Sequence, residues 1–382
     1  MPVIYPYVQY SGMWTPQSQM QAVAAGTWSG LPLPGLYSWG NNALGQLGLG
    51  DVTYRSSPVQ VGALTTWSKI ESGEYFTLAI KTDGTLWSWG TGGSGRLGLG
   101  NTTDYSSPKQ VGALTTWATT SCTSNFTLAT KTDGTLWSWG LNSSGQLGLG
   151  NVTAYSSPKQ VGALTTWSKV AAGDSFSIAT KTDGTLWSWG LNSIGQLGLG
   201  NTTNYSSPKQ VGALTTWLNI AAERLSTLAT KTDGTLWSWG LNSSGQLGLG
   251  NVTAYSSPKQ VGALTTWSNI AGYNHSVAIK TDGTLWSWGL NSSGQLGLGN
   301  TTNYSSPKQV GALTNWSKVS AGSAHSITSK TDGTLWAWGL NSSGQLGLGN
   351  VTNYSSPKQV GALTTWSIIA CGNVFSLAIT SH

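Results

Sequence analysis

Short apolar runs with the two-residue period of a β-strand recur along the chain, each bounded by turn residues. Residues 76–80 (Phe-Thr-Leu-Ala-Ile) and 85–89 (Thr-Leu-Trp-Ser-Trp) are rich in β-branched and aromatic side chains, and an Asp-Gly turn lies between them. Asp-Gly between two such runs is a strong signal for a β-hairpin. Further strands are predicted around residues 67–71 and 109–111, and no window shows a sustained helical period. The pattern therefore predicts units of four strands.

The four-strand unit recurs seven times, at a spacing of 50 or 49 residues. Residues 131–167 even return letter for letter as residues 231–267. An aromatic-glycine pair marks each unit, at Trp39, Trp89, Trp139, Trp189, Trp239, Trp288 and Trp338. A period of this length is typical of solenoids and propellers.

The two ends of the repeat region carry complementary halves of one unit. Residues 36–40 (Leu-Tyr-Ser-Trp-Gly) lack the strand that precedes them in other units, and the chain stops just after that strand, at residues 376–380. Pairing of the halves leaves no free sheet edge, whereas a solenoid needs capping repeats, which are absent from the sequence. The predicted fold is all-β: a seven-bladed β-propeller with four-stranded blades, closed by the N- and C-terminal strands.

Tryptophan is abundant, with 22 residues in a chain of 382. A buried Trp side chain removes about 150–250 Å² from water, and most of these residues recur in every unit. We expect them to pack blade against blade. Stacking of exposed Trp rings on sugars or bases is the alternative.

The net charge of +6 comes from two sets of lysines. Six lysines stand in Lys-Thr-Asp-Gly turns, where the Asp is expected to neutralise them. Six others follow Ser-Ser-Pro without a partner in sequence: Lys109, Lys159, Lys209, Lys259, Lys308 and Lys358. In a ring these six would form a belt able to attract an acidic surface. We favour the other interpretation, solvated lysines that keep strand edges from aggregating, so a nucleic-acid partner is not expected.

Residue patterns that carry catalysis are missing. Only three histidines occur, His275, His325 and His382, without a Cys-His, Ser-His-Asp or paired-carboxylate pattern around them. The Gly-Gln-Leu-Gly-Leu-Gly stretches lack the Lys-Ser/Thr of a phosphate loop. Cys122 and Cys371 share one column of the repeat and are expected to be small buried residues. We therefore predict a protein without enzymatic activity, cofactor or metal site.

Residues 1–30 stand outside the repeats and carry no charge. Their aromatic side chains are Tyr5, Tyr7, Tyr10, Trp14 and Trp28. Such a segment is poorly suited to be a solvated tail, so we predict an attachment segment at residues 1–30 and a propeller at residues 31–382. No basic residue precedes Arg55 and no apolar run approaches about 18 residues, which argues against a secretory signal and membrane insertion.

The motif order resembles a known family. Gly-x-x-(His/Phe)-(Ser/Thr)-x-Ala is followed by Asp-Gly-x-Leu-Trp-x-Trp-Gly, Asn-x-x-Gly-Gln-Leu-Gly-Leu-Gly and Pro-x-x-Val, over residues 36–380. This order resembles the regulator-of-chromosome-condensation repeat, which implies a seven-bladed propeller. Function does not follow, since the family includes guanine-nucleotide exchange factors, a plant ultraviolet receptor and secreted protein inhibitors. The exchange factors use a wedge inserted in one blade, for which the constant spacing leaves no room. The near-identical units also resemble repeat proteins of environmental bacteria and their viruses.

One short column breaks the uniformity of the repeats. The seven pairs that occupy it all differ: Glu74-Tyr75, Ser124-Asn125, Asp174-Ser175, Arg224-Leu225, Tyr273-Asn274, Ser323-Ala324 and Asn373-Val374. We call these 14 residues the variable ring, because one pair per blade would bring them to one face around the centre. They are the predicted binding site for a protein or glycan surface; drift in loops without a packing role is the alternative.

These observations predict a non-enzymatic binding or structural propeller, displayed on a virion or cell surface without a secretory signal. Residues 1–30 would join it to a virion or another multi-subunit assembly. The alternative is a cytoplasmic protein-interaction propeller of the exchange-factor type.

Overall fold

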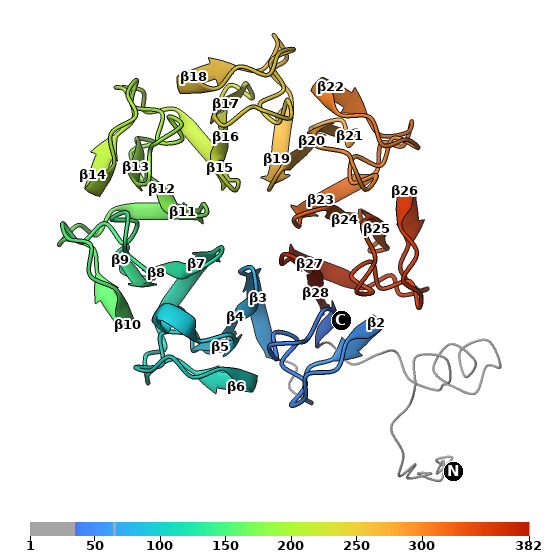
Figure 1. Cartoon of the computed structure of the whole chain (residues 1–382), viewed down its shortest axis with the longest axis horizontal. Helices are drawn as coiled ribbons and strands as arrows, with labels where there is room; N and C mark the ends of the chain where they lie inside the picture. The colour runs from blue at the N-terminus through green and yellow to red at the C-terminus, as the bar shows by residue number, and fades with distance from the viewer. Residues whose placement is uncertain (1–34, 64–65, 382) are drawn as a thin grey trace, which may run out of the picture. The chain divides into compact units, whose positions relative to one another are not determined.

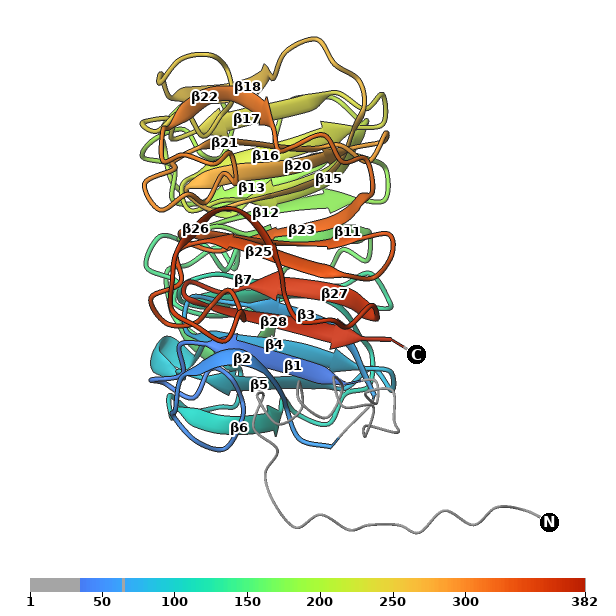
Figure 2. The same cartoon turned by 90° about the vertical axis from the view of Figure 1, so that its right-hand side faces the viewer.

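Seven four-stranded antiparallel sheets form a ring in the computed structural model, which describes residues 35–63 and 66–381. Figure 1 shows the sheets as blades around a centre, and Figure 2 shows the same ring from its side. Within these residues the only helix is a single 3-10 turn, η1 (Gly93–Gly95). The predicted all-β, seven-bladed propeller is confirmed.

Every blade has the same order of strands from the centre to the rim. The innermost strands are β3 (Trp67–Ser72), β7 (Trp117–Cys122), β11 (Trp167–Ala172), β15 (Trp217–Ala222), β19 (Trp267–Gly272), β23 (Trp316–Ala321) and β27 (Trp366–Cys371). The second strands are β4 (Phe76–Lys81), β8 (Phe126–Lys131), β12 (Phe176–Lys181), β16 (Ser226–Lys231), β20 (His275–Lys280), β24 (His325–Lys330) and β28 (Phe375–Thr380).

The two outer strands complete each blade. The third strands are β5 (Leu86–Gly90), β9 (Leu136–Gly140), β13 (Leu186–Gly190), β17 (Leu236–Gly240), β21 (Leu285–Gly289), β25 (Leu335–Gly339) and β1 (Leu36–Gly40). The outermost strands are β6 (Tyr105–Gln110), β10 (Tyr155–Gln160), β14 (Tyr205–Gln210), β18 (Tyr255–Gln260), β22 (Tyr304–Gln309), β26 (Tyr354–Gln359) and β2 (Arg55–Gln60). The outermost strands begin earlier than predicted, at Tyr105 instead of Lys109, because the Ser-Ser-Pro segment joins the strand.

Strands from both ends of the repeat region build the closing blade, whose order is β2-β1-β28-β27. The antiparallel register pairs Leu36 with Ile379 and Gly40 with Phe375, and β1 and β28 lie side by side in Figure 2. Just before β1, the carbonyl of Gly35 accepts a hydrogen bond from the backbone N–H of Thr380, the last residue of β28, at 3.0 Å. The predicted closure by the N- and C-terminal strands is confirmed.

One fully buried Trp per blade packs against the preceding blade. The indole of Trp89 donates to the carbonyl oxygen of Gln46 at 3.0 Å and lies against Gly48. A Cβ atom at Gly48 would lie 2.6 Å from the indole nitrogen, and the φ of +73° also favours glycine. The same contact recurs for Trp39, Trp139, Trp189, Trp239, Trp288 and Trp338. The Gly-Gln-Leu-Gly stretches thus form the surface against which the Trp ring of the next blade packs.

The lysine of each Lys-Thr-Asp-Gly turn is neutralised less directly than we expected. The Lys81 ammonium lies 3.7 Å from the centroid of the Trp87 ring, and within the described residues it forms no ion pair with Asp83. The Asp83 carboxylate instead accepts from the backbone and the hydroxyl of Thr85. That hydroxyl accepts from the indole of Trp87 at 2.9 Å, so Asp83 orders the turn and Trp87 holds the cation.

One blade replaces two packing residues together. In three blades a Phe ring covers a Gly; a Cβ at Gly73 would lie 2.1 Å from the Phe76 ring. In the fourth blade Ser226 replaces the Phe, and the buried carboxyl group of Glu223 replaces the Gly. This carboxyl group is hydrogen-bonded to Ser226 and, at 2.6 Å, to Ser276. Burial raises the pKa of Glu223 to about 8.

Two other blades place histidines at the Phe position. The hydroxyl of Ser326 donates to the carbonyl of Gln295, so it accepts from Nε2 of His275 at 2.7 Å. His325 makes the equivalent bond to Ser376 at 3.0 Å. Burial lowers the pKa of His275 to about 3 and that of His325 to about 4. Both rings are therefore neutral residues of the packed interior.

Closure of the ring generates a prediction about cooperativity. Deletion of residues 367–382 removes β28 and nearly all of β27, which leaves β1 with an open edge and uncovers the blades packed against β27. We expect a much lower melting temperature and loss of a single cooperative transition, measured by calorimetry. Deletion of residues 381–382 alone is the control and should change neither; unchanged melting of the longer deletion would contradict the closure.

The buried carboxyl group generates a prediction about pH. Because the folded protein holds the Glu223 proton more tightly than the unfolded chain, its contribution to stability is complete below pH ~4.5 and is lost as pH rises to ~8. Glu223→Gln should therefore match wild type near pH ~4 and exceed it by roughly a few kcal/mol near pH ~9. Urea unfolding of both proteins at each pH gives the difference; a variant less stable at the higher pH would contradict it.

Candidate functional site

The seven innermost strands surround a central cavity of about 270 Å³. At one level of the cavity six blades contribute small side chains, from Ser121, Ala171, Ala221, Ala271, Ser320 and Ala370. The remaining blade contributes Glu71, and burial raises the pKa of this carboxyl group to about 7. At this level the wall of the channel therefore consists of small, uncharged side chains except at the blade that contributes Glu71.

The variable ring lies at one mouth of this channel, in the turns between the innermost and second strands. The first residue of several pairs is hydrogen-bonded to the neighbouring blade. The backbone N–H of Glu74 donates to the carbonyl of Thr123, and the backbone N–H of Asp174 donates to the carbonyl of Arg224. The second residue of each pair lies farther out, since its carbonyl accepts from the residue after the Trp-Gly pair, as in Tyr75 with Thr91. The structure thus brings the pairs to one face, as the repeat predicted.

Side chains at this mouth bond from blade to blade. The Asn373 amide donates to Oε1 of Glu74 and to the hydroxyl of Tyr75, both at 3.1 Å. Across the mouth, Nε of Arg224 lies 3.7 Å from a carboxylate oxygen of Asp174. About half of the Arg224 side chain stays exposed, so the pair remains open to a partner.

Tyr273 lies close enough to Glu74, Asp174 and Arg224 for their charges to act on its hydroxyl. Burial raises the pKa of its hydroxyl well above the usual range, and the nearby charges of Glu74 and Asp174 raise it further, while Arg224 lowers it. Tyr273 and Glu74 also both line the channel. Side chains from distant blades therefore face one another across a single opening.

The other members of the variable ring contribute less to the mouth. Ser124 is buried and donates to the carboxylate of Asp174, and Ser323 bonds to the backbone of Asn373. Six further residues are half-buried and lie outward of the opening: Asn125, Ser175, Leu225, Asn274, Ala324 and Val374. The predicted site thus narrows to Glu74, Tyr75, Asp174, Arg224, Tyr273 and Asn373.

Two residues near the mouth were missed by the sequence analysis. Arg96 donates to the carbonyl of Ser124 at 2.7 Å and so supports one loop of the variable ring. Glu71 supplies the carboxyl group inside the channel. The signal was present in both cases, because Arg96 replaces a repeated Gln and Glu71 replaces a repeated Ala or Ser.

The six belt lysines lie away from this mouth, on the outermost strands. Each ammonium lies over the Tyr ring of its own strand, as Lys109 does at 5.5 Å from the Tyr105 centroid. In the closing blade Val59 and Arg55 take these two positions, so the belt is interrupted. The predicted rim of positive charge exists, but each member already has an aromatic partner.

Three further points concern metal ions, membranes and the N-terminal segment. Among residues 35–63 and 66–381, no group of three or more His, Cys, Asp or Glu side chains is placed to hold a metal ion. In the same part of the chain, no helix is long and apolar enough to cross a membrane. The predicted attachment residues Tyr5, Tyr7, Tyr10, Trp14 and Trp28, and the boundary predicted after residue 30, lie outside the described residues.

Family models match along the repeats. The model of the RCC1-like domain matches residues 164–382, and that of the regulator of chromosome condensation (RCC1) repeat matches residues 35–80, 83–130 and 133–180. A second model of the RCC1 repeat matches residues 67–96 and 117–146. No curated protein matches the chain significantly.

Solved structures share the fold at low sequence identity. Prp20p from Saccharomyces cerevisiae, a protein with binding properties toward Gsp1p and histones, is 21% identical with a TM-score of 0.80, covering 92% of each chain. Human WBSCR16 is 22% identical with a TM-score of 0.82, covering 91% of this chain and 99% of its own. Yeast RCC1 (Prp20) bound to Kap60 is 20% identical with a TM-score of 0.81, covering 100% of this chain and 97% of its own.

The domain model alone spans more than half of the 382 residues, and the repeat models cover most of the remainder of the ring. With seven blades built on the same motif, the chain belongs to the RCC1-like family.

Proposed function

We propose that this protein is a non-catalytic binding propeller that recognises a protein partner through the variable ring at the channel mouth. The observation that carries the proposal is the concentration of non-repeated polar and aromatic side chains at one opening of an otherwise repetitive molecule. Exposure alone does not explain it, because other exposed turns, such as Asn-Ser-Ser-Gly, hardly vary between blades.

The chemistry of the mouth suits protein recognition. Tyr and Arg are enriched at interface hot spots, and rigid Tyr side chains combine well with small polar groups. Tyr75 and Tyr273 supply the rings, Arg224 supplies an accessible guanidinium, and Glu74 and Asp174 supply carboxylates. Since Asn373 and Asp174 already orient three of these side chains, little conformational entropy remains to be lost on binding.

The relatives support protein binding in general terms. Prp20p was solved in connection with its binding to Gsp1p and histones, and yeast RCC1 (Prp20) was solved bound to Kap60. An identity of 20% to 21% supports the shared fold and identifies no partner for this chain.

Display on a virion or cell surface depends on residues 1–30, which lie outside the described residues, and it stays a prediction. Cytoplasmic location, the alternative, also stays a prediction. The absence of enzymatic activity is part of the proposal and rests on the residue patterns discussed above.

The exchange-factor alternative is the less favoured one. Within the described residues every blade has the same four strands, the turn between β19 and β20 is one residue shorter than its counterparts, and η1 is the single helical turn. No wedge of the kind used by the family's exchange factors is therefore present there. We expect that this protein does not accelerate nucleotide release from a small GTPase. An exchange factor of the family serves as the positive control. Acceleration comparable to that control would contradict the expectation.

Substitutions at the mouth test the proposed function. Replacing Tyr75, Arg224 and Tyr273 together by Ala should weaken partner binding by at least about 2 kcal/mol for each hot-spot residue. The readout is quantitative mass spectrometry of proteins captured from extracts of the source organism. The melting temperature should stay near that of wild type, because none of these side chains belongs to the core between blades.

The matched control replaces the six belt lysines by Gln. It should retain the captured proteins and only slow association at low ionic strength, since exposed charges act through a field that salt screens. The reverse result, with binding lost on lysine replacement and kept after the triple substitution, would refute the proposal and favour an acidic ligand on the rim.

A further inference from the structure

One carboxyl group in the central channel has no partner. Within residues 35–63 and 66–381, Glu71 forms no hydrogen bond, and the two ion pairs found there belong to Arg55 and Arg224. Its side chain lines the channel and is only half-buried, so a ligand in the channel can reach it. A carboxylate that is withdrawn from bulk water costs free energy unless a cation or a donor offsets the charge. The position therefore points to a cation from outside the chain.

The other carboxyl group with a strongly raised pKa differs in this respect. Glu223 is hydrogen-bonded to Ser226 and Ser276 and is only 1% exposed. It does not line the channel. Burial raises the pKa of both carboxyl groups, but only Glu71 faces a cavity that a ligand can enter.

The wall of the channel near Glu71 is mainly apolar. Alanines and branched aliphatic side chains line it: Ala171, Ala221, Ala271, Ala370, Val170, Ile220, Ile270, Val319 and Ile369. Glu74, at the mouth, is the other charged residue of the lining, and no Lys, Arg or His from the described part of the chain lines the channel. The volume of about 270 Å³ is slightly below the range of pockets that enclose a drug-sized ligand, roughly 300–1,000 Å³. One slender group with an apolar stem and a cationic head fits these walls.

The two ends of the innermost strands carry charges of opposite sign. Lysines occupy the third position of three innermost strands, toward the end away from the variable ring: Lys69, Lys169 and Lys318. The Lys69 ammonium donates to the carbonyl of Ala118 in the next blade, so it already has a partner other than Glu71. At the variable-ring mouth Arg224 is paired with Asp174. A cation that enters through this mouth therefore meets Glu74 first and then Glu71, without passing a lysine.

We propose that the channel receives a lysine side chain of the protein partner, with its ammonium on Glu71 and its alkyl stem against the alanines. This inference rests on the proposed function, because the variable ring holds the protein that carries the lysine. An ammonium has three donors and a guanidinium has five, and the apolar wall offers few acceptors, so lysine fits better than arginine. A metal ion fits poorly, since no group of three or more His, Cys, Asp or Glu side chains among the described residues could hold one.

The test is a titration of the full chain, labelled at the alanine and valine methyl groups, with n-butylammonium, which has the four carbons and the ammonium of a lysine side chain. The methyl resonances of Ala171 and Ala221 should shift and saturate. 1-Butanol has the same stem without the charge and should bind at least about tenfold more weakly, because a charge-assisted hydrogen bond is lost. Equal affinity for both compounds, or no saturation by n-butylammonium up to roughly 100 mM, would overturn the proposal.

An arginine analogue tests the choice of head group. n-Propylguanidinium has the stem and the planar head of an arginine side chain. It should bind more weakly than n-butylammonium, because more of its donors stay unsatisfied against the apolar wall. Tighter binding of the guanidinium would show that the assignment to lysine is wrong.

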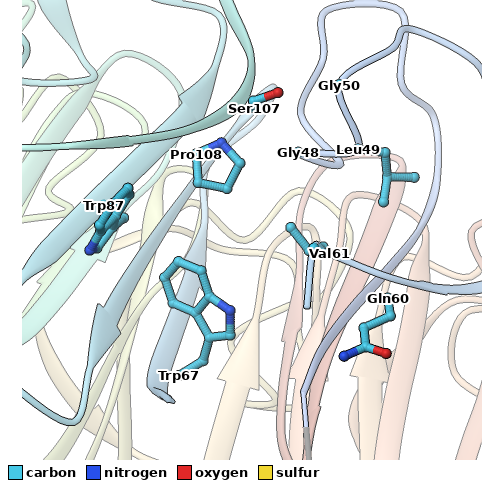
Figure 3. A pocket seen from close by; sticks show the side chains of 10 residues that line it. Gly48, Leu49, Gly50, Gln60, Val61, Trp67, Trp87, Ser107 and Pro108 are labelled. Atoms are coloured by element: carbon cyan, nitrogen blue, oxygen red, sulfur yellow. The ribbon is translucent and has the colours of Figure 1, made fainter. Parts of the chain in front are cut away.

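A pocket on the rim supplies an internal control for unspecific uptake of the alkyl stem. It lies where the closing blade meets the next blade, has a volume of about 370 Å³, and is lined by Trp67, Trp87 and Val61, among others (Figure 3). None of the described residues that line it is charged. The Val61 methyl resonances should therefore respond no more to n-butylammonium than to 1-butanol. Equal shifts at Val61 and at Val170, in the channel, would mean unspecific uptake and would refute the site.

Matched substitutions of the two carboxyl groups assign the site. Glu71→Gln keeps the shape of the side chain, removes the charge, and should weaken binding of n-butylammonium about tenfold or more. Glu223→Gln, outside the channel, should leave the affinity unchanged. Glu71→Ser is a second variant, and it should fold because Ser121 occupies this position in the next blade. Unchanged affinity in both Glu71 variants, or an equal loss in the Glu223 variant, would overturn the assignment.

Capture of partner proteins separates this inference from the proposed function. Glu71→Ser should lose both the captured proteins and the binding of n-butylammonium. If Glu71→Ser keeps the captured proteins while the triple Ala substitution at Tyr75, Arg224 and Tyr273 loses them, the proposed function stands and the lysine inference is wrong. If the triple substitution keeps them, the proposed function itself is refuted, whatever n-butylammonium does.

Discussion

The contact of one Trp indole with the glycine and carbonyl of the preceding blade is the constraint on which the rest of the ring depends. The Trp89 indole closes onto Gly48 with no space for a Cβ, and its N–H donates to the buried Gln46 carbonyl, which also accepts from the hydroxyl of Thr77. Geometry and hydrogen bonding therefore fix the same two residues in every unit. A blade that lost either would lose its position relative to its neighbour, and in a closed ring this error cannot be absorbed at an edge.

This constraint also explains where the sequence is free to vary. The turns of the variable ring lie above the interblade core and use mainly backbone groups to contact the next blade, as in the bond from Glu74 to Thr123. Side chains there can change without disturbing the Trp contacts. Arg224 and Tyr273 can therefore differ from their counterparts, whereas Trp239 and Trp288 in the same blades cannot.

The fold was predictable from the sequence because its determinants are local and repeated. Strand alternation, the Asp-Gly turns and the split unit together predicted four strands, seven blades and closure. The position of the variable pairs at one face followed from the same periodicity.

Contacts between side chains were harder to predict, since they depend on which groups meet in space. The stacking of Lys81 on Trp87 could not be inferred, because Asp83 is the nearer partner in sequence. The mutual compensation of Glu223 and Ser226 shows only when the Phe76 ring is seen to occupy the space above Gly73. The indole N–H of Trp67, which has no hydrogen-bond partner among residues 35–63 and 66–381, likewise has no sequence signal, since Trp89 and Trp87 belong to the same residue type and do have partners.

The antiparallel pair in the closing blade has a mechanical consequence. Gly35 and Thr380 lie at the same end of the β1–β28 pair, where their backbones are bonded to each other. A pulling force applied between these two points would load the hydrogen bonds one at a time, as in opening a zipper, instead of shearing all of them together. The ring would thus resist heat through its cooperative core and still open at low force along this seam. A tether attached through one end only would leave the seam unloaded.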